Sequence, residues 1–217
     1  MQINKTKANI TESDLDTIRS VIPQYYTPKR LAHTLSVERE CAALAKIYDF
    51  SEQDTMRLRA AALLHDITKK MSGAEQLAYC TEHNIAFTDE ETHIPKILHS
   101  RTGAHFARKL FPGLVDDGIY EAIYYHTTAK PAMEPLTALL YLADYIEPER
   151  DFEDCVKLRS QFYALLEEKD KYDALSEALV VSFGYTLSSL LCERSLVHVD
   201  IVAARNYYLL QINKDKK

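Results

Sequence analysis

The stretch Ala60-Ala61-Ala62-Leu63-Leu64-His65-Asp66-Ile67-Thr68-Lys69 joins a run of helix-forming apolar residues to two polar residues at its end. Neither His65 nor Asp66 helps to fill a core, and burying either without a partner is costly. At a helix end such a pair can cap the helix or form a surface hydrogen bond. The two groups can also bind one cation together, so the rest of the sequence has to distinguish these alternatives.

The composition predicts a globular, helical protein. Of the 217 residues, 47% are hydrophobic and 27% are charged, which is enough for a sizeable core. Only five glycines and seven prolines occur, and this favours long helices over a turn-rich β architecture. The formal charge of −6, from 26 basic and 32 acidic residues, argues against general nucleic-acid binding. A few local cations or a metal ion can still hold a phosphorylated small molecule.

No segment predicts export or a membrane anchor. The chain has no run of about 18 apolar residues, and its N-terminus lacks a signal-peptide core. Cys41, Cys80, Cys155 and Cys192 are widely spaced and form no C-x-x-C pair, which is typical of reduced cysteines. We therefore expect a cytoplasmic protein that needs no membrane, and no thiolate metal site.

Hydrophobic periodicity near 3.6 residues predicts helices along nearly the whole chain. Ser51 begins an N-capping pattern, S-E-Q-D, for the helix that reaches the His-Asp pair. No segment alternates with the period of a strand, so an all-α single domain is predicted. The expected helices cover 11–25, 29–48, 51–64, 74–83, 95–110, 117–125, 135–146, 152–168 and 170–212, the last divided near 193–198, before a solvated lysine-rich end at 214–217.

Six polar residues stand where core-facing helices would carry apolar ones. Apart from the adjacent His-Asp pair, they lie on different predicted helices or helix ends, and helical bundles build metal sites from facing helices in this way. Imidazole with carboxylate suits iron, manganese, cobalt or zinc. Such an ion can activate water and polarise a phosphoryl oxygen, which makes hydrolysis at phosphorus natural. The six residues are His33, His65, Asp66, His99, His126 and Asp144.

The order H…HD…H…H…D resembles the HD-domain superfamily of metal-dependent phosphohydrolases. Four phrases make the resemblance specific to the YqeK family of bacterial symmetrical bis(5′-nucleosyl)-tetraphosphatases, from about residue 26 to 159. The resemblance implies a single helical HD-domain bundle with an N-terminal helical extension (1–25), an HD core (26–160) and C-terminal helices on the same domain (161–217). The phrases are R-L-A-H-T at 30–34, L-L-H-D-I-T-K at 63–69, A-I-Y-Y-H-T-T at 122–128 and L-A-D-Y-I-E-P-E-R-D-F at 142–152.

The resemblance also implies roles for particular residues. Its metal ligands match His33, His65, Asp66 and Asp144, while His99 and His126 either hold a second metal or face the substrate phosphates. Asp66, His99 and His126 are the expected catalytic residues. Substrate contacts are expected from Arg30, Lys69, His99, His126, Thr127 and Arg150. One residue departs from the family pattern: Ala129 stands where a glycine commonly follows the His-Thr-Thr run. His83, His93, His105 and His198 lie outside the matched phrases and are expected to be structural.

The activity implied by the resemblance is the hydrolysis of diadenosine tetraphosphate to two ADP by metal-activated water. Iron is the expected metal, with manganese, cobalt or zinc as alternatives. The partners are then a dinucleoside polyphosphate and ADP, and a homodimer is one expected assembly. Three alternatives stay open: another HD phosphohydrolase acting on nucleoside mono- or triphosphates or a guanosine alarmone, a non-catalytic nucleotide-binding HD protein, and an oxygenase with two irons.

Overall fold

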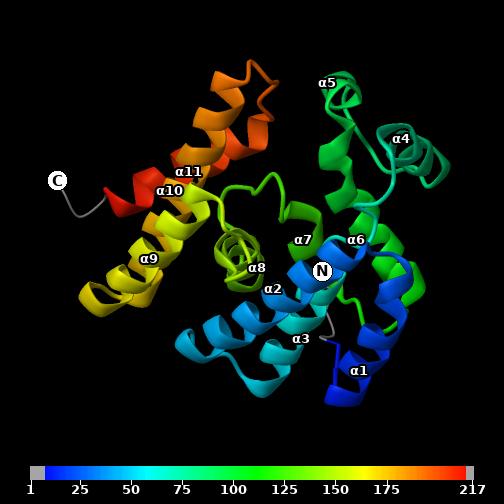
Figure 1. The fold of residues 1–217 in the computed structure, drawn as a ribbon, viewed down its shortest axis with the longest axis horizontal. Coiled ribbons are helices and arrows are strands. Elements are labelled where there is room, and N and C mark those ends of the chain that lie inside the picture. Colours follow the sequence, from blue (N-terminus) through cyan, green and yellow to red (C-terminus); the bar gives the residue numbers. More distant parts are fainter. Residues whose placement is uncertain (1–7, 214–217) are drawn as a thin grey trace, which may run out of the picture.

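The computed structural model describes residues 8–213, and all regular structure in this range is helical, as predicted (Figure 1). Residues 1–7 and the lysine-rich end at 214–217, expected as a solvated tail, lie outside the described residues. Two short 3₁₀ helices are Ile22–Gln24 (η1) and Pro95–Leu98 (η2). The α-helices are Glu12–Val21 (α1), Pro28–Ile47 (α2), Glu52–Leu64 (α3), Gly73–Glu82 (α4), Asp89–His93 (α5), His99–Leu110 (α6), Asp117–Tyr125 (α7), Pro135–Ile146 (α8), Glu153–Glu168 (α9), Lys171–Cys192 (α10) and Val199–Ile212 (α11).

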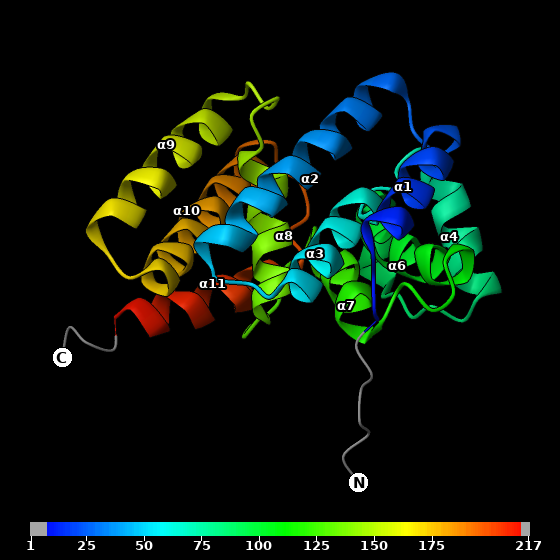
Figure 2. The same cartoon turned by 90° about the horizontal axis from the view of Figure 1, so that it is seen from below.

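The centre of the molecule is a bundle of α2, α3, α7 and α8. The hairpin of α2 and α3 turns at Asp49, whose φ of +52° is the left-handed conformation that commonly ends a helix. Helix α8 packs against α2, α3 and α7. In Figure 1, α9–α11 lie on one side of this bundle, and α1, α4, α5 and α6 lie on the other; Figure 2 shows the same division from below.

Helix α8 is buried on nearly all sides, because every residue from Leu136 to Ala143 is buried. A helix in the middle of a core is apolar all round, and Pro135 at its first turn fits the position where no backbone donor is needed. Asp144 follows directly after this apolar run. The sequence of α8 therefore carries one carboxylate to the interior of the bundle.

Polar side chains fix the starts of most helices. Ser51, expected as a cap, accepts a hydrogen bond from the backbone N–H of Asp54, and Thr11 accepts one from that of Asp14. Ser72, Thr88, Asp116 and Asp170 do the same for α4, α5, α7 and α10. Such caps satisfy N–H groups that have no partner inside the helix. They explain why helix starts agree closely with the pattern in the sequence.

Two differences from the predicted helices concern the chain around residue 95. Helix α5 was not predicted, although Thr88 and Glu91 form a capping box, T-x-x-E, that marks its start. The segment expected as one helix from 95 to 110 is divided into η2 and α6. At this junction Nδ1–H of the His99 ring donates a hydrogen bond to the Lys96 carbonyl oxygen, with a distance of 2.6 Å. The predicted break between α10 and α11 is confirmed, since α10 ends at Cys192 and α11 begins at Val199.

Helix α10 is the one helix in the described part of the chain that is long and apolar enough to cross a membrane. Its buried residues include Ala178, Leu179 and Phe183, and it packs against α8, α9 and α11. A core helix passes the same test of length and composition, so this feature is weak evidence for a membrane span.

Candidate metal centre

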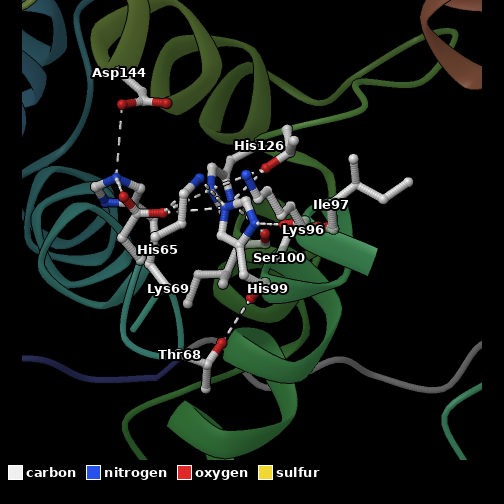
Figure 3. Close-up of polar contacts among 12 residues, drawn as sticks. His65, Thr68, Lys69, Lys96, Ile97, His99, Ser100, His126 and Asp144 are labelled. Atoms are coloured by element: carbon white, nitrogen blue, oxygen red, sulfur yellow. Dashed lines mark hydrogen bonds and ion pairs between the residues drawn. The ribbon is translucent and has the colours of Figure 1, made fainter. Parts of the chain in front are cut away.

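The six polar residues predicted from the sequence converge from separate elements. The end of α3 delivers two of them: His65 and Asp66 follow five buried residues, Ala60–Leu64, and are themselves 0% and 2% exposed. His33 comes from the first half of α2, and Asp144 comes from the last turn of α8. His99 begins α6, and His126 follows α7 directly. Figure 3 shows the side chains of His65, His99 and His126 gathered together, with Asp144 facing them from α8.

Asp66 lies between the two halves of the cluster. Its Oδ1 is 3.1 Å from His99 Nε2 and 3.5 Å from His126 Nε2. Its Oδ2 is 3.6 Å from His65 Nε2. Asp144 Oδ1 lies 2.9 Å from His33 Nε2 and 3.7 Å from His65 Nε2. The residues form three overlapping groups, and within each group the possible ligand atoms lie within 4.8 Å of one another. The groups are His33-His65-Asp66, His65-His126-Asp144 and Asp66-His99-His126.

Three of the four histidines are oriented by the backbone three residues earlier. Nδ1 of His65 lies 2.6 Å from the Ala62 carbonyl, and Nδ1 of His126 lies 2.7 Å from the Ile123 carbonyl. His99 uses the Lys96 carbonyl in the same way. Because a carbonyl oxygen can only accept, each of these Nδ1 atoms carries the proton. The lone pair of each ring is then on Nε2, which faces the cluster.

His33 is oriented by a side chain that the sequence analysis did not single out. It lies inside α2, and its Nδ1 is 2.9 Å from Oε1 of Glu147. Glu147 is 1% exposed, and its other oxygen accepts the backbone N–H of Glu149 at 2.6 Å. The signal was present, because Glu147 belongs to the quoted phrase I-E-P at 146–148. A carboxylate that receives the Nδ1 proton of a metal-binding histidine fixes the ring and raises its basicity.

The residues present fit a metal ion. His65 Nε2 is buried and has no hydrogen-bond partner, which is unusual for a buried polar atom. His33 Nε2 and Asp66 Oδ1 lie 2.9 and 3.1 Å from other candidate ligand atoms, Asp144 Oδ1 and His99 Nε2. His99 Nε2 and His126 Nε2 lie 3.1 Å apart, and two lone pairs at this distance repel each other unless a cation or a donor lies between them. Nitrogen and carboxylate donors together suit first-row divalent ions. The cluster could therefore hold one ion, or two ions sharing Asp66.

Three cationic side chains and a hydroxyl surround the cluster. Arg30 Nη1 donates to Asp66 Oδ2 at 2.7 Å, and Arg150 Nη2 donates to Asp144 Oδ1 at 2.8 Å. Lys69 Nζ lies 2.8 Å from His99 Nε2. Thr127 Oγ1 is 3.1 Å from the same nitrogen and 3.2 Å from His126 Nε2. All four residues predicted to contact substrate besides the histidines are thus beside the candidate ligand atoms.

The electrostatic environment favours the ligating form of two histidines. Burial lowers the pKa of His65 to about 4, and burial together with the charge of Lys69 lowers the pKa of His99 to about 4. Burial also acts on His33, but the carboxylates of Asp144 and Glu147 outweigh it and raise its pKa to about 9. Opposing burial, nearby positive charges hold the pKa values of Asp66 and Asp144 well below their usual range.

The other histidines lie outside the cluster. His105 accepts or donates a hydrogen bond with the Tyr79 hydroxyl at 3.0 Å and stacks on His83, with ring centroids 4.8 Å apart. His198 Nε2 lies 2.8 Å from Oε1 of the fully buried Glu91. His93 ends α5 and lines a cavity beside the site.

Comparisons with known proteins define the class. The model of the HD domain family matches residues 30–149, a range that contains all six cluster residues. The chain belongs to the HD domain family. Family membership and the His/Asp cluster together identify a protein that binds a divalent metal ion.

Relatives of nearly full length narrow the class further. A symmetrical bis(5′-nucleosyl)-tetraphosphatase of Halalkalibacterium halodurans is 31% identical over 195 residues, which are 88% of this chain and 95% of that protein. A protein of the same name from Bacillus subtilis is 28% identical over 186 residues, 86% of this chain and 92% of the relative. A solved structure from Clostridium acetobutylicum is described as a predicted HD superfamily hydrolase involved in NAD metabolism. Its sequence is 31% identical to this one, and the two structures superimpose with a TM-score of 0.80 over 91% of this chain and 97% of that chain.

Proposed function

We propose that this chain is a metal-dependent symmetrical bis(5′-nucleosyl)-tetraphosphatase, which splits diadenosine tetraphosphate into two molecules of ADP. The observation that carries the proposal is the cluster of six candidate ligands, four of them buried, with Arg30, Lys69 and Arg150 beside it. Two relatives that match this chain over nearly their whole length bear the name of this activity. A cationic rim around a metal centre suits a substrate with four phosphates.

His33, His65, Asp66 and Asp144 are the proposed ligands of the first metal. His99 and His126 either complete a second metal site with Asp66 or contact the phosphates directly. Iron is the metal we propose, with manganese, cobalt or zinc as alternatives that the same donors accept. When bound, the ion makes water a stronger nucleophile and draws charge from a phosphoryl oxygen.

The remaining chemistry belongs to the side chains. Asp66 orients the attacking water, whose oxygen forms a bond to one of the two central phosphorus atoms. The bridging P–O bond on the opposite side breaks and leaves its electron pair on the departing ADP oxygen. Nε2 of His99 or His126, which carries the lone pair, accepts the proton that the water loses and passes it to that oxygen. Arg30 and Arg150 present planar guanidinium groups to the phosphate oxygens and neutralise the charge that develops in the transition state. Lys69 and Thr127 hold the neighbouring phosphate.

Other expectations accompany this proposal. The chain divides into a helical extension at 1–25, an HD core at 26–160 and C-terminal helices at 161–217. The protein works in the cytoplasm without nucleic acid or a membrane, and a homodimer is its expected assembly. These expectations stay predictions.

The test is a product assay on protein whose metal content has been measured. With diadenosine tetraphosphate, anion-exchange chromatography should resolve ADP as the sole product. A mixture of AMP and ATP would contradict the symmetrical mechanism, and hydrolysis of a guanosine alarmone alone would favour another HD phosphohydrolase. Asp66→Ala should remove bound metal and turnover while circular dichroism still reports a helical protein. Glu153→Gln, at a fully exposed position on α9, is the control that should retain both.

A further inference from the structure

A cavity of about 590 Å³ lies directly beside the metal centre. One wall is η2 with the residues before it, and the opposite wall is the end of α10, the connection to α11 and the start of α11. In Figure 1 these two walls face each other, with α5 and η2 on one side and the α10–α11 connection on the other. The size is that of a pocket for a small ligand.

The cavity and the metal centre share residues. Thr127 lines the cavity, and its hydroxyl is 3.1 Å from His99 Nε2. Lys96 also lines it, and the Lys96 carbonyl is the group that orients His99. In Figure 3, Lys96 and Ile97 lie beyond His99, on the side away from Asp144. A polyphosphate chain that reaches the metal centre past Thr127 therefore places the group attached to its end in this cavity.

The lining suits an uncharged, flat group attached to a polyanion. Much of the wall is aliphatic, and its polar groups are hydroxyls such as those of Thr128 and Ser195 and the imidazoles of His93 and His198. No carboxylate side chain and no tyrosine is among the residues that line it, whereas Lys96 adds a positive charge. Leu196, at one edge, is 50% exposed and offers apolar surface that no described residue covers fully.

The second large cavity has the opposite character. Its lining, between α3, α7 and α8, includes none of the cluster residues and one cation, Arg57, against five acidic residues: Asp54, Asp116, Asp117, Glu121 and Glu134. These carboxylates would repel a polyphosphate. Of the two cavities, the one at η2 is therefore the one that fits the substrate.

A buried ionic group makes the wall of the η2 cavity rigid. Glu91, which is 0% exposed, accepts hydrogen bonds from Arg101 and lies 2.8 Å from His198 Nε2. This contact ties α5 to the start of α11 across the cavity. Gly73 completes the packing, since a Cβ at this position would lie 2.6 Å from Pro95 Cγ. The pocket is thus preformed.

We propose that the cavity between η2 and the α10–α11 connection binds the nucleoside of one half of the dinucleotide, with Leu190, Leu196 and Ile201 packing against the base. The inference rests on the proposed function, because that function supplies the dinucleotide. The binding energy is largely apolar contact with the base face, so the affinity for ADP exceeds that for inorganic diphosphate.

The test compares ADP and inorganic diphosphate as ligands of the metal-loaded protein by calorimetry. Leu190→Trp fills the cavity, and Leu191→Trp is the matched control at a neighbouring position that is 67% exposed and outside the lining. We expect Leu190→Trp to weaken ADP binding about tenfold, within the range for loss of one base contact, and to leave diphosphate affinity unchanged. Leu191→Trp should alter neither. A smaller change, Leu196→Ser, should weaken ADP binding in the same selective way.

Two results of the binding measurements would overturn the pocket. One is unchanged ADP affinity in both Leu190→Trp and Leu196→Ser, and the other is an equal loss of ADP and diphosphate binding with an unchanged melting temperature. The proposed function fails separately: wild-type protein that binds ADP more tightly than diphosphate, yet leaves diadenosine tetraphosphate intact, supports the pocket and refutes the activity. Turnover with an unchanged KM in Leu190→Trp supports the activity and refutes the pocket.

Discussion

Replacing Glu147 should weaken metal binding although this residue is not a proposed ligand. Its carboxylate accepts the Nδ1 proton of His33 at 2.9 Å and the backbone N–H of Glu149 at 2.6 Å, and it is 1% exposed. His33 lies within a helix and lacks the carbonyl contact that orients the other three rings. In Glu147→Ala nothing on this side fixes the ring, so Nε2 loses both its direction and part of its basicity.

The magnitude follows from the kind of contact that is lost. Removing a partner of this type typically lowers metal affinity about 10- to 100-fold, which corresponds to about 1.4–2.8 kcal/mol. We expect Glu147→Ala near the upper end, because it removes both hydrogen bonds. Glu147→Gln should lie near the lower end, because its amide oxygen still accepts from His33 but its amide nitrogen faces the N–H of Glu149.

The assay is a competition between the protein and a chelator of known affinity, followed by metal analysis. Glu149→Gln removes the same charge two residues away, where the side chain is 62% exposed, and should bind metal like the wild type. Thermal unfolding of the metal-free variants separates loss of affinity from loss of fold. If Glu147→Gln and Glu147→Ala both bind metal within twofold of Glu149→Gln, His33 does not need this carboxylate and the reasoning is wrong.

Three further predictions concern stability. Ala129 has φ of +56° and is 0% exposed. Ala129→Gly should change the free energy of unfolding, measured by denaturant titration, by less than about 1 kcal/mol, because relief of left-handed strain offsets a lost methyl and a more flexible unfolded chain. Ala129→Val should show a clear loss of stability in the same measurement. Glu91→Gln should cost about 3 kcal/mol at pH 7, because it removes the buried carboxylate that pairs with Arg101. Thr88, Arg101 and His198 outweigh burial and hold the pKa of Glu91 below its value of 4.5 in the unfolded chain, so this stabilisation is complete above pH 4.5 and the difference from wild type should shrink as pH falls through the folded-state pKa. Chelation should lower the melting temperature by about 5–10 °C if metal was at 100 times its Kd, and an unchanged melting temperature would argue against a metal that binds the folded state.

The helices were predictable because the signals that place them are local. Thr11 and Ser51 cap their helices through contacts three residues away, and the apolar run of α8 reports its complete burial. Helix α5 was missed because it has only five residues, too few for a hydrophobic period to be visible. The division between η2 and α6 depends on the His99 ring, and periodicity does not include side-chain contacts of this kind.

The backbone conformation at Ala129 explains why the family pattern commonly has glycine at this position. A residue with φ of +56° is the position where glycine is preferred, so the difference in sequence points to a real constraint of the backbone. Ala129 N–H still donates to the Tyr125 carbonyl at 2.8 Å. The turn after His126 is therefore preserved without glycine, and its residue Thr127 stays beside His99.

The histidine and aspartate residues could be selected from the sequence because each is a polar residue at the end of an apolar run, or inside an amphipathic helix. What the pattern could not give is the difference between His33 and the other three histidines. His65, His99 and His126 each stand at a helix terminus, where the carbonyl three residues earlier is free to accept the Nδ1 proton. His33 stands inside α2, where such carbonyls are already bonded within the helix. It therefore requires an acceptor from elsewhere, and Glu147, which is 114 residues away in sequence, supplies it. The position of a histidine within its helix thus predicts whether its orienting partner is local backbone or a distant side chain, and only the second kind needs the tertiary structure to be found.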